Sequence, residues 1–336
     1  MDGRDRSRSP PASVAGQECE KPKRTAVLGK REYAMDTPQL GRLRDSSGLA
    51  PTELRARLKE DGYIFVRGLL PPEPVRAAKL SILEHLRDQG LLAEGAELEE
   101  GIIGAIHSSD QGRLRGAEQL SAATPVQALL THEALRGFFC ELFGRPALTY
   151  DYKWLRAVRR GESSGFHMDT VYMGSLETEN LLTCWIPLMS VPLELGGLAV
   201  CRGSSSDPGF ARVRETYGRL DLDRDDVGGT GWFSEDPEEA GRFGGRWETS
   251  DFKPGDIVVF TMHTMHGSCV NRTDRWRLSF DVRWQPADEP VDSRWMKDGD
   301  GQIPGLKSRW QLHRSDPKEY PRTMEMAKKD WGLSKD

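Results

Sequence analysis

Residues 163–174, SSGFHMDTVYMG, place a histidine and an aspartate two positions apart, at His167 and Asp169. In a β-strand, side chains at positions i and i+2 project from the same face. The pair could therefore present one imidazole nitrogen and one carboxylate to a single cation. Chance weakens this signal, because seven histidines and 52 acidic residues in 336 predict roughly one such pair. The pair becomes informative only together with a third ligand elsewhere.

The stretch 260–281, FTMHTMHGSCVNRTDRWRLSFD, supplies two further histidines, His263 and His266. Three positions apart in a strand, they would point to opposite faces, so both cannot bind one ion there. His266 is favoured because it stands at the expected end of the strand, before Gly267. Two histidines and one carboxylate form the facial triad of non-haem Fe(II) oxygenases, which leaves three positions open for a keto acid and O2.

A keto acid such as 2-oxoglutarate also needs a cation for its distal carboxylate, and arginine offers a two-pronged match. Arg275 and Arg277 lie on the strand expected after the turn at 269–274, and either could face inward. An isolated arginine in such a place is normally an exposed strand cation. The short distance in sequence from a candidate iron ligand favours a binding role here.

The segment from residue 145 onward must position these side chains. It contains short β-rich runs separated by Gly, Pro and Asn turns, a pattern typical of packed antiparallel sheets. The sequence therefore predicts a mainly β fold with flanking helices, whose core at 145–286 is a double-stranded β-helix of the jelly-roll or cupin-like kind. Residues 205–252 are predicted to be an inserted lid, since they are long and irregular and carry Trp232, Phe233 and Trp247.

The remaining segments are predicted from composition and periodicity. Residues 49–144 form a largely helical part, with a helix near 72–90 and another over 125–143 that ends at Gly144. His85 and His132 in these helices are interpreted as solvent-facing or capping residues. Residues 1–48 are rich in Arg, Ser, Pro, Gly and Lys and are predicted to be a disordered tail, and residues 296–336 a C-terminal extension of the domain at 49–295.

Composition excludes several classes of protein. The net charge of −5 argues against nucleic-acid binding by bulk electrostatics, and no apolar run approaches the roughly 18 residues of a membrane span. Five scattered cysteines without CxxC spacing indicate reduced thiols. We therefore expect a cytoplasmic protein, with the nucleus as an alternative because of the basic segment 21–31. The sequence carries no signal for an oligomeric state.

From about residue 60 to 286 the chain resembles the phytanoyl-CoA dioxygenase family of Fe(II)/2-oxoglutarate oxygenases. The resemblance rests on motifs that occur in the family's order: His167-Met168-Asp169, Trp185 18 residues after the histidine, GDIVVF at 255–260, His266-Gly267-Ser268, Asn271 and Arg277-Leu278-Ser279. Each motif alone is weak, but their order and spacing, including the gap of 11 between His266 and Arg277, are specific.

The resemblance implies an oxygenase that hydroxylates a small molecule with O2 and releases succinate and CO2 from 2-oxoglutarate. The substrate would be a carboxylic acid, amino acid, acyl ester or specialised metabolite, and ascorbate would support activity. By resemblance, the catalytic Fe(II) ligands are His167, Asp169 and His266. Arg277 would hold the distal carboxylate of 2-oxoglutarate in a pocket lined by Ser268 and Trp185, and Ser279 and Tyr152 are further candidates for this pocket. Expected substrate contacts are Tyr172, Met173, Trp232 and Arg283.

The chain departs from the family at one place. Many members carry a lysine in a K-I-x-H-A-L-H motif, whereas the comparable stretch 101–109 has His107 but no lysine. Tyr152 and Lys153 are candidates to complete the pocket. Because Asp169 is present, hydroxylation is favoured over halogenation. Two alternatives stay open: a jelly-roll hydrolase or isomerase that holds zinc or manganese, and a non-catalytic binding protein.

Overall fold

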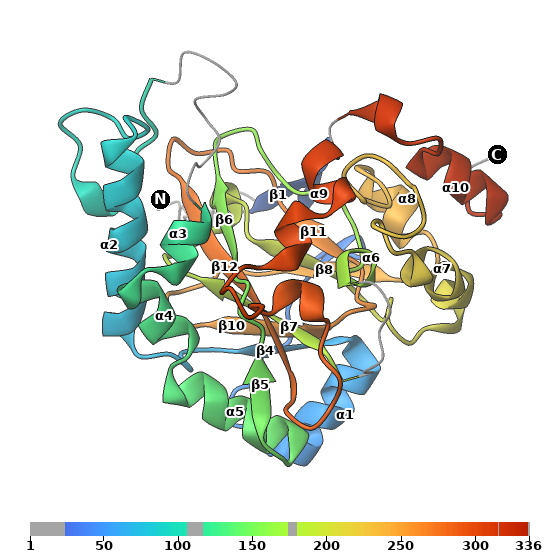
Figure 1. The fold of residues 1–336 in the computed structure, drawn as a ribbon, viewed down its shortest axis with the longest axis horizontal. Helices are drawn as coiled ribbons and strands as arrows, with labels where there is room; N and C mark the ends of the chain where they lie inside the picture. The colour runs from blue at the N-terminus through green and yellow to red at the C-terminus, as the bar shows by residue number, and fades with distance from the viewer. Residues whose placement is uncertain (1–23, 106–116, 174–179, 315, 335–336) are drawn as a thin grey trace, which may run out of the picture.

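Two β-sheets form the centre of the protein (Figure 1). The computed structural model describes residues 24–105, 117–173, 180–314 and 316–334. The first sheet contains β4 (Tyr63–Val66), β10 (Ile257–Thr261), β7 (Leu182–Pro187), β12 (Arg277–Pro286) and β5 (Ala147–Thr149) in that order, with β6 (Trp154–Val158) also paired to β12. The second contains β11 (His266–Ser268), β8 (Leu198–Arg202), β9 (Arg246–Thr249) and β3 (Leu40–Arg42). All pairings in these two sheets are antiparallel except that of β3 with β9, and the predicted mainly β, cupin-like fold is confirmed.

Helices from the N-terminal half cover the six-stranded sheet. They are α1 (Pro51–Asp61), α2 (Pro72–Asp88), α3 (Ala117–Ala122), α4 (Thr124–Leu130) and α5 (Glu133–Phe143), and in Figure 1 they follow the left and lower edges of the strands. Their apolar faces join the strands in one core; Phe139 of α5, for example, stacks on Trp284 of β12 with ring centroids 4.7 Å apart. These helices pack against the strands of the six-stranded sheet and bury one face of it.

The helix predicted over 125–143 is two helices. The chain breaks at Thr131 and His132, and the His132 imidazole accepts a hydrogen bond from the Ala134 N–H at the start of α5. The capping interpretation of His132 is therefore confirmed. Gly144 ends α5 with a φ of 70°, a backbone conformation that favours glycine.

The prediction of a disordered segment up to residue 48 is wrong for residues 24–48. Strands β1 (Thr25–Leu28) and β2 (Arg31–Ala34) form a hairpin, and β3 extends the second sheet. Ala26, Leu28 and Leu40 are fully buried. Two or three apolar side chains per strand are too few to show a period, and their partners lie about 200 positions away, as in the pairing of Leu28 with Cys269.

The insertion is ordered, and its end belongs to the core. It carries η3 (Pro208–Phe210), α7 (Ala211–Glu215), η4 (Tyr217–Arg219) and α8 (Pro237–Gly241), and residues 246–249 form the core strand β9. The prediction of an irregular insertion through residue 252 is wrong at this end, because Trp247 and its neighbours pair with β3 and β8.

The C-terminal extension packs on the insertion. It follows η5 (Ser293–Trp295) and contains η6 (Pro304–Lys307), α9 (Arg309–His313), η7 (Pro317–Glu319) and α10 (Met324–Asp330). Figure 1 shows α10 beside α7 and α8. The fully buried Lys328 of α10 donates to the Phe233 carbonyl at 3.0 Å and to Glu239 at 2.8 Å. The short elements η1 (Leu98–Glu100), α6 (Thr170–Met173) and η2 (Leu193–Leu195) complete the fold.

Two predictions from composition can be compared with the described residues. Cys140, Cys184, Cys201 and Cys269 are free thiols, as predicted, whereas Cys19 lies outside the described residues. Among the helices in the described part of the chain, none is long and apolar enough to cross a membrane.

Candidate active site

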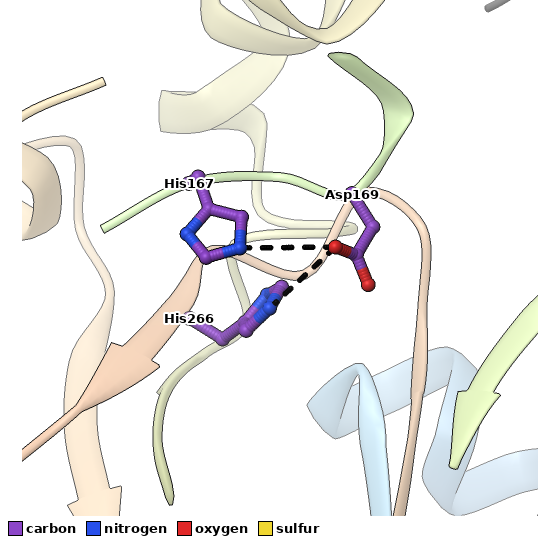
Figure 2. Close-up of side chains that lie close together, drawn as sticks. All are labelled: His167, Asp169 and His266. Atoms are coloured by element: carbon purple, nitrogen blue, oxygen red, sulfur yellow. Dashed lines mark ion pairs between the residues drawn. The ribbon is translucent and has the colours of Figure 1, made fainter. Parts of the chain in front are cut away.

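His167, Asp169 and His266 meet at one point (Figure 2). His167 lies in an extended segment whose backbone exchanges two hydrogen bonds of 2.9 Å with His266, the first residue of β11. The preceding residue, Phe166, is fully buried and anchors this segment, and Asp169 stands directly before α6. The Nε2 atoms of His167 and His266 lie 3.7 Å and 3.8 Å from Asp169 Oδ1, as the dashed lines in Figure 2 show.

The donor atoms of this triad fit a single divalent ion. Two ligands of one ion can be at most twice the metal–ligand distance apart, or about 4.2 Å for a bond of about 2.1 Å. The distances of 3.7 Å and 3.8 Å are within that limit. Both imidazoles donate through Nδ1–H to backbone carbonyls, His167 to Gly165 at 2.8 Å and His266 to Thr264 at 2.9 Å. These bonds leave the Nε2 lone pairs directed at the shared point.

The Asp169 carboxylate is held from its other side. Its Oδ2 accepts a hydrogen bond of 2.6 Å from the Thr183 hydroxyl and forms an ion pair of 3.0 Å with Arg283. Thr183 on β7 and Arg283 on β12 are register partners, so one position of the sheet supplies both contacts. Oδ1 is thereby turned toward the two imidazoles. Arg283 was predicted to contact substrate, whereas the structure pairs it with Asp169.

Burial and neighbouring charges determine the protonation of the triad. Burial lowers the pKa of His167 to about 3, and the neighbouring His266 adds to this effect. Burial alone would raise the pKa of Asp169, but Arg283 and the two imidazoles reverse this and hold it below its usual range. At neutral pH the site therefore offers a neutral imidazole and a carboxylate anion, the forms that bind metal ions.

Strand β12 directs a row of polar side chains into the site at alternate positions. These residues are Arg277, Ser279, Asp281 and Arg283. Arg277 is only 3% exposed and donates to the Ser279 hydroxyl at 2.6 Å, while its buried Nε has no hydrogen-bond partner among the described residues. Burial lowers the pKa of Arg277 to about 10. A buried guanidinium without a carboxylate partner is suited to bind the carboxylate of a ligand.

Arg275, the other arginine of this strand region, lies outside the site. It is exposed and its carboxylate contact is Glu100, at 3.9 Å. The structure thus separates two arginines that their place in the expected strand left equivalent, and the buried one is Arg277, which the family motif indicates. His263 lies in the turn between β10 and β11, not in a strand as predicted, and it is not part of the triad.

A cavity of about 850 Å³ opens beside the triad. Residues predicted for the site line it as follows: His167, His266, Arg277, Ser268, Trp185, Tyr152, Tyr172, Trp232 and Arg283. Ser279 does not line the cavity itself, but its hydroxyl accepts a hydrogen bond from Arg277, which does. Ser268 Oγ accepts a hydrogen bond of 2.8 Å from the Ser164 N–H. This bond joins the segment that contains His167 to the strand that contains His266.

Two predicted contacts lie elsewhere. Met173 is buried in an apolar cluster that includes Tyr150 and Trp295, and it does not line the cavity. Lys153 is also buried, and its ammonium donates to the Thr149 hydroxyl at 2.6 Å and to the Tyr150 carbonyl. Lys153 therefore does not complete the pocket, whereas Tyr152 lines it. His107 lies outside the described residues.

Sequence reasoning missed several cavity residues. Arg156 of β6 lines the cavity and forms an ion pair of 2.7 Å with Asp281. The alternation of the run Trp154–Val158 could have indicated that Arg156 faces inward. No sequence signal pointed to four further lining residues, which come from the β1–β2 turn, from α9 and from the residue after α9: Lys30, Trp310, Gln311 and Arg314.

Comparison with known proteins identifies the family. The phytanoyl-CoA dioxygenase (PhyH) family profile matches residues 58–279. The 1-deoxypentalenic acid 11-beta-hydroxylase of Streptomyces arenae is 26% identical over 241 residues, which is 68% of this chain and 78% of the relative. The enzyme of the same name from Streptomyces exfoliatus is 26% identical over 239 residues, with 68% and 78% of the two chains covered.

Among solved structures, the fold is shared with the epimerase SnoN in complex with Fe3+, alpha ketoglutarate and nogalamycin RO. The TM-score is 0.50 at 22% identity, with 76% of this chain and 92% of that chain covered. The order of the motifs, the buried triad and the family match over 58–279 agree. The chain belongs to the phytanoyl-CoA dioxygenase family and is a non-haem Fe(II)- and 2-oxoglutarate-dependent oxygenase.

Proposed function

We propose that His167, Asp169 and His266 bind Fe(II), that Arg277 binds the distal carboxylate of 2-oxoglutarate, and that the enzyme hydroxylates a small organic molecule in the same cavity. One observation carries this proposal. The triad lies at the same cavity as Arg277, a buried arginine without a carboxylate partner among the described residues. When bound, iron and 2-oxoglutarate activate O2, so that substrate, 2-oxoglutarate and O2 give hydroxylated substrate, succinate and CO2.

The protein's own residues bind and orient the reactants. Thr183 and Arg283 hold Asp169 so that Oδ1 is available as a ligand. Arg277 gives the keto acid one fixed end, and Trp185 and Ser268 line the cavity beside it. The relatives named hydroxylases support hydroxylation of a small molecule, and we propose that ascorbate supports activity by keeping iron reduced.

Anaerobic titration tests the assignment of ligands. Fe(II) and 2-oxoglutarate added to the protein should produce the weak visible band of the bound chelate. His266→Ala should abolish the band, and Arg277→Ala should raise the Kd of 2-oxoglutarate about ten- to hundredfold, as expected for the loss of a charge-assisted contact. Arg275→Ala is the matched control, since this exposed arginine on the same segment lies outside the cavity. The proposal is wrong if the wild-type protein forms no chelate or if His266→Ala forms it unchanged.

The other classes make a different prediction. A zinc or manganese hydrolase or isomerase has no need for a buried arginine without a carboxylate partner, and neither has an inactive binding protein. Succinate release that depends on Arg277 would therefore exclude both classes.

A further inference from the structure

Arg156 is an accessible arginine of the cavity lining. Its side chain is 43% exposed and is held by the ion pair with Asp281. It lies opposite Ser279 in the pairing of β6 with β12, and directly opposed residues project from the same face of a sheet. Arg156 therefore shares its face with Arg277 and Asp281.

The only carboxylate in contact with Arg156 in the described structure is that of Asp281. This pair joins Nε of Arg156 to Oδ2 of Asp281 at 2.7 Å. The remaining guanidinium N–H groups belong to a side chain that lines the cavity, and no hydrogen bond to them is formed within the described residues. An arginine held in place through Nε can still present its terminal nitrogens to a planar anion.

Both carboxylates of 2-oxoglutarate already have partners in the proposed function. One binds the metal, and the distal one binds Arg277. Arg283 is engaged by Asp169 at 3.0 Å. The Arg283 side chain is also only 1% exposed, whereas that of Arg156 is 43% exposed. Arg156 is thus the accessible cation on this face of the sheet that remains for a second ligand. Lys30 and Arg314 add positive charge to the cavity lining.

Aromatic rings complete the environment of this ligand. Tyr172, Trp154 and Trp310 line the cavity, and the ring of Trp310 lies 5.4 Å from that of Tyr172. The indole N–H of Trp310 donates to the Gly229 carbonyl at 3.0 Å, which fixes the ring in the cavity lining. Because α9 lies beyond the family match at 58–279, this wall is supplied by the chain's own extension. The cavity of about 850 Å³ has room for an apolar body beside 2-oxoglutarate.

We propose that Arg156 binds an anionic group of the prime substrate, which is a carboxylic acid with an apolar ring or chain that packs against Tyr172 and Trp310. This inference rests on the proposed function, because it places the substrate beside bound 2-oxoglutarate.

The test uses pairs of compounds that differ only in charge. Cyclic and branched carboxylic acids of about 10–20 carbons are tested with the iron-loaded enzyme, because molecules of this size fit a drug-sized pocket. The methyl ester of each acid is tested in parallel. Succinate release above the rate without substrate is the readout. Wild type should respond to at least one acid and not to its ester. Arg156→Gln should raise the KM for that acid about ten- to hundredfold and remove the preference for acid over ester.

Three further variants separate binding from folding. Arg156→Gln combined with Asp281→Asn leaves no unpaired carboxylate and should show the same loss, while Arg156→Lys should regain part of the preference. Arg160→Gln removes an arginine two positions beyond β6 that pairs with Asp274 and does not line the cavity, so it should behave as wild type. Thermal unfolding of each variant verifies the fold.

Titration with 2-oxoglutarate distinguishes a failure of the Arg156 inference from a failure of the proposed function. Arg156→Gln should leave the Kd of 2-oxoglutarate within about twofold of wild type, because Arg277 holds that ligand. A rise of about tenfold, the loss expected for a charge-assisted contact, would overturn the inference and assign Arg156 to 2-oxoglutarate. A wild-type enzyme that responds to esters as well as to acids, or to no acid in the set, would also overturn it. Absence of the chelate in wild type would instead refute the proposed function.

Discussion

At the scale of single residues, Asp169 connects the proposed metal site to the sheet. One oxygen faces the two imidazoles and the other is held by Thr183 and Arg283. Arg283 is 1% exposed and lies 4.4 Å from the centre of the Trp154 ring, so it cannot move to another partner without breaking packed contacts. In the protein without metal, Arg283 is the cation that compensates the buried carboxylate.

Arg283→Leu should therefore destabilise the metal-free protein by about 3–5 kcal/mol, the usual effect of breaking a buried ion pair. A bound divalent ion would supply the missing positive charge, so metal should stabilise this variant more than wild type. Thermal unfolding with and without Fe(II), measured anaerobically, gives both quantities. Arg275→Leu is the control at an exposed position. An equal stabilisation by metal in Arg283→Leu and wild type would contradict this role.

At the scale of elements, segments far apart in sequence close the cavity. The turn between β1 and β2 contributes Lys30, the insertion contributes Trp232, and α9 contributes Trp310. The β1–β2 hairpin is attached by apolar contacts and by an ion pair of 2.5 Å between Arg24 and Asp251. The N-terminal strands are thus part of the domain that forms the site.

Leu28→Ala tests this attachment. Leu28 is fully buried in an apolar cluster with Ala26 and Phe166 and pairs with Cys269, so its truncation should lower the free energy of unfolding by about 2–5 kcal/mol. Gln39→Ala, at an exposed position before β3, should change it by less than about 0.5 kcal/mol. Urea unfolding measures both. Similar values for the two variants would mean that the hairpin contributes nothing to the fold.

At the scale of the whole molecule, Lys153 lies where the helical layer meets the sheet. It is 2% exposed, its carbonyl accepts a hydrogen bond of 3.0 Å from Ser121, and burial lowers its pKa to about 7. In the unfolded chain this lysine has an ordinary pKa near 10.5. Between these values the unfolded chain binds a proton that the folded protein does not, so stability rises with pH.

This effect predicts the pH dependence of unfolding. Between about pH 7 and about 8.5, Lys153 should add up to about 1.4 kcal/mol per pH unit to the free energy of unfolding. Cysteines of the unfolded chain also ionise toward the upper end of this range, but they do so equally in both proteins, so the comparison isolates Lys153. Lys153→Met should lack this slope. Urea unfolding of both proteins across this range gives the difference. Parallel pH profiles would show that Lys153 stays protonated in the folded protein.

Much of the site was predictable from sequence because its signals are local. His167 and Asp169 are two positions apart, Arg277 follows His266 by 11, and the β-rich runs after residue 145 mark the strands. Side-chain alternation in a strand is a property of the chain itself. The family motifs add order and spacing to these signals, and they lead to the same three ligands that the structure brings together.

Other features were decided only by the tertiary structure, because they depend on contacts between distant segments. Arg277 and Arg275 differ in burial only once β12 packs against β6 and β7. The strands at 25–42 gain order from partners some 200 positions away. The sequence alone thus determined the kind of chemistry, through ligand types and their spacing. The family motif named Arg277, but only the fold buries it beside the cavity while Arg275 stays exposed, and only the fold brings together the side chains that line the cavity. Burial and cavity shape are sums over contacts that no local pattern records.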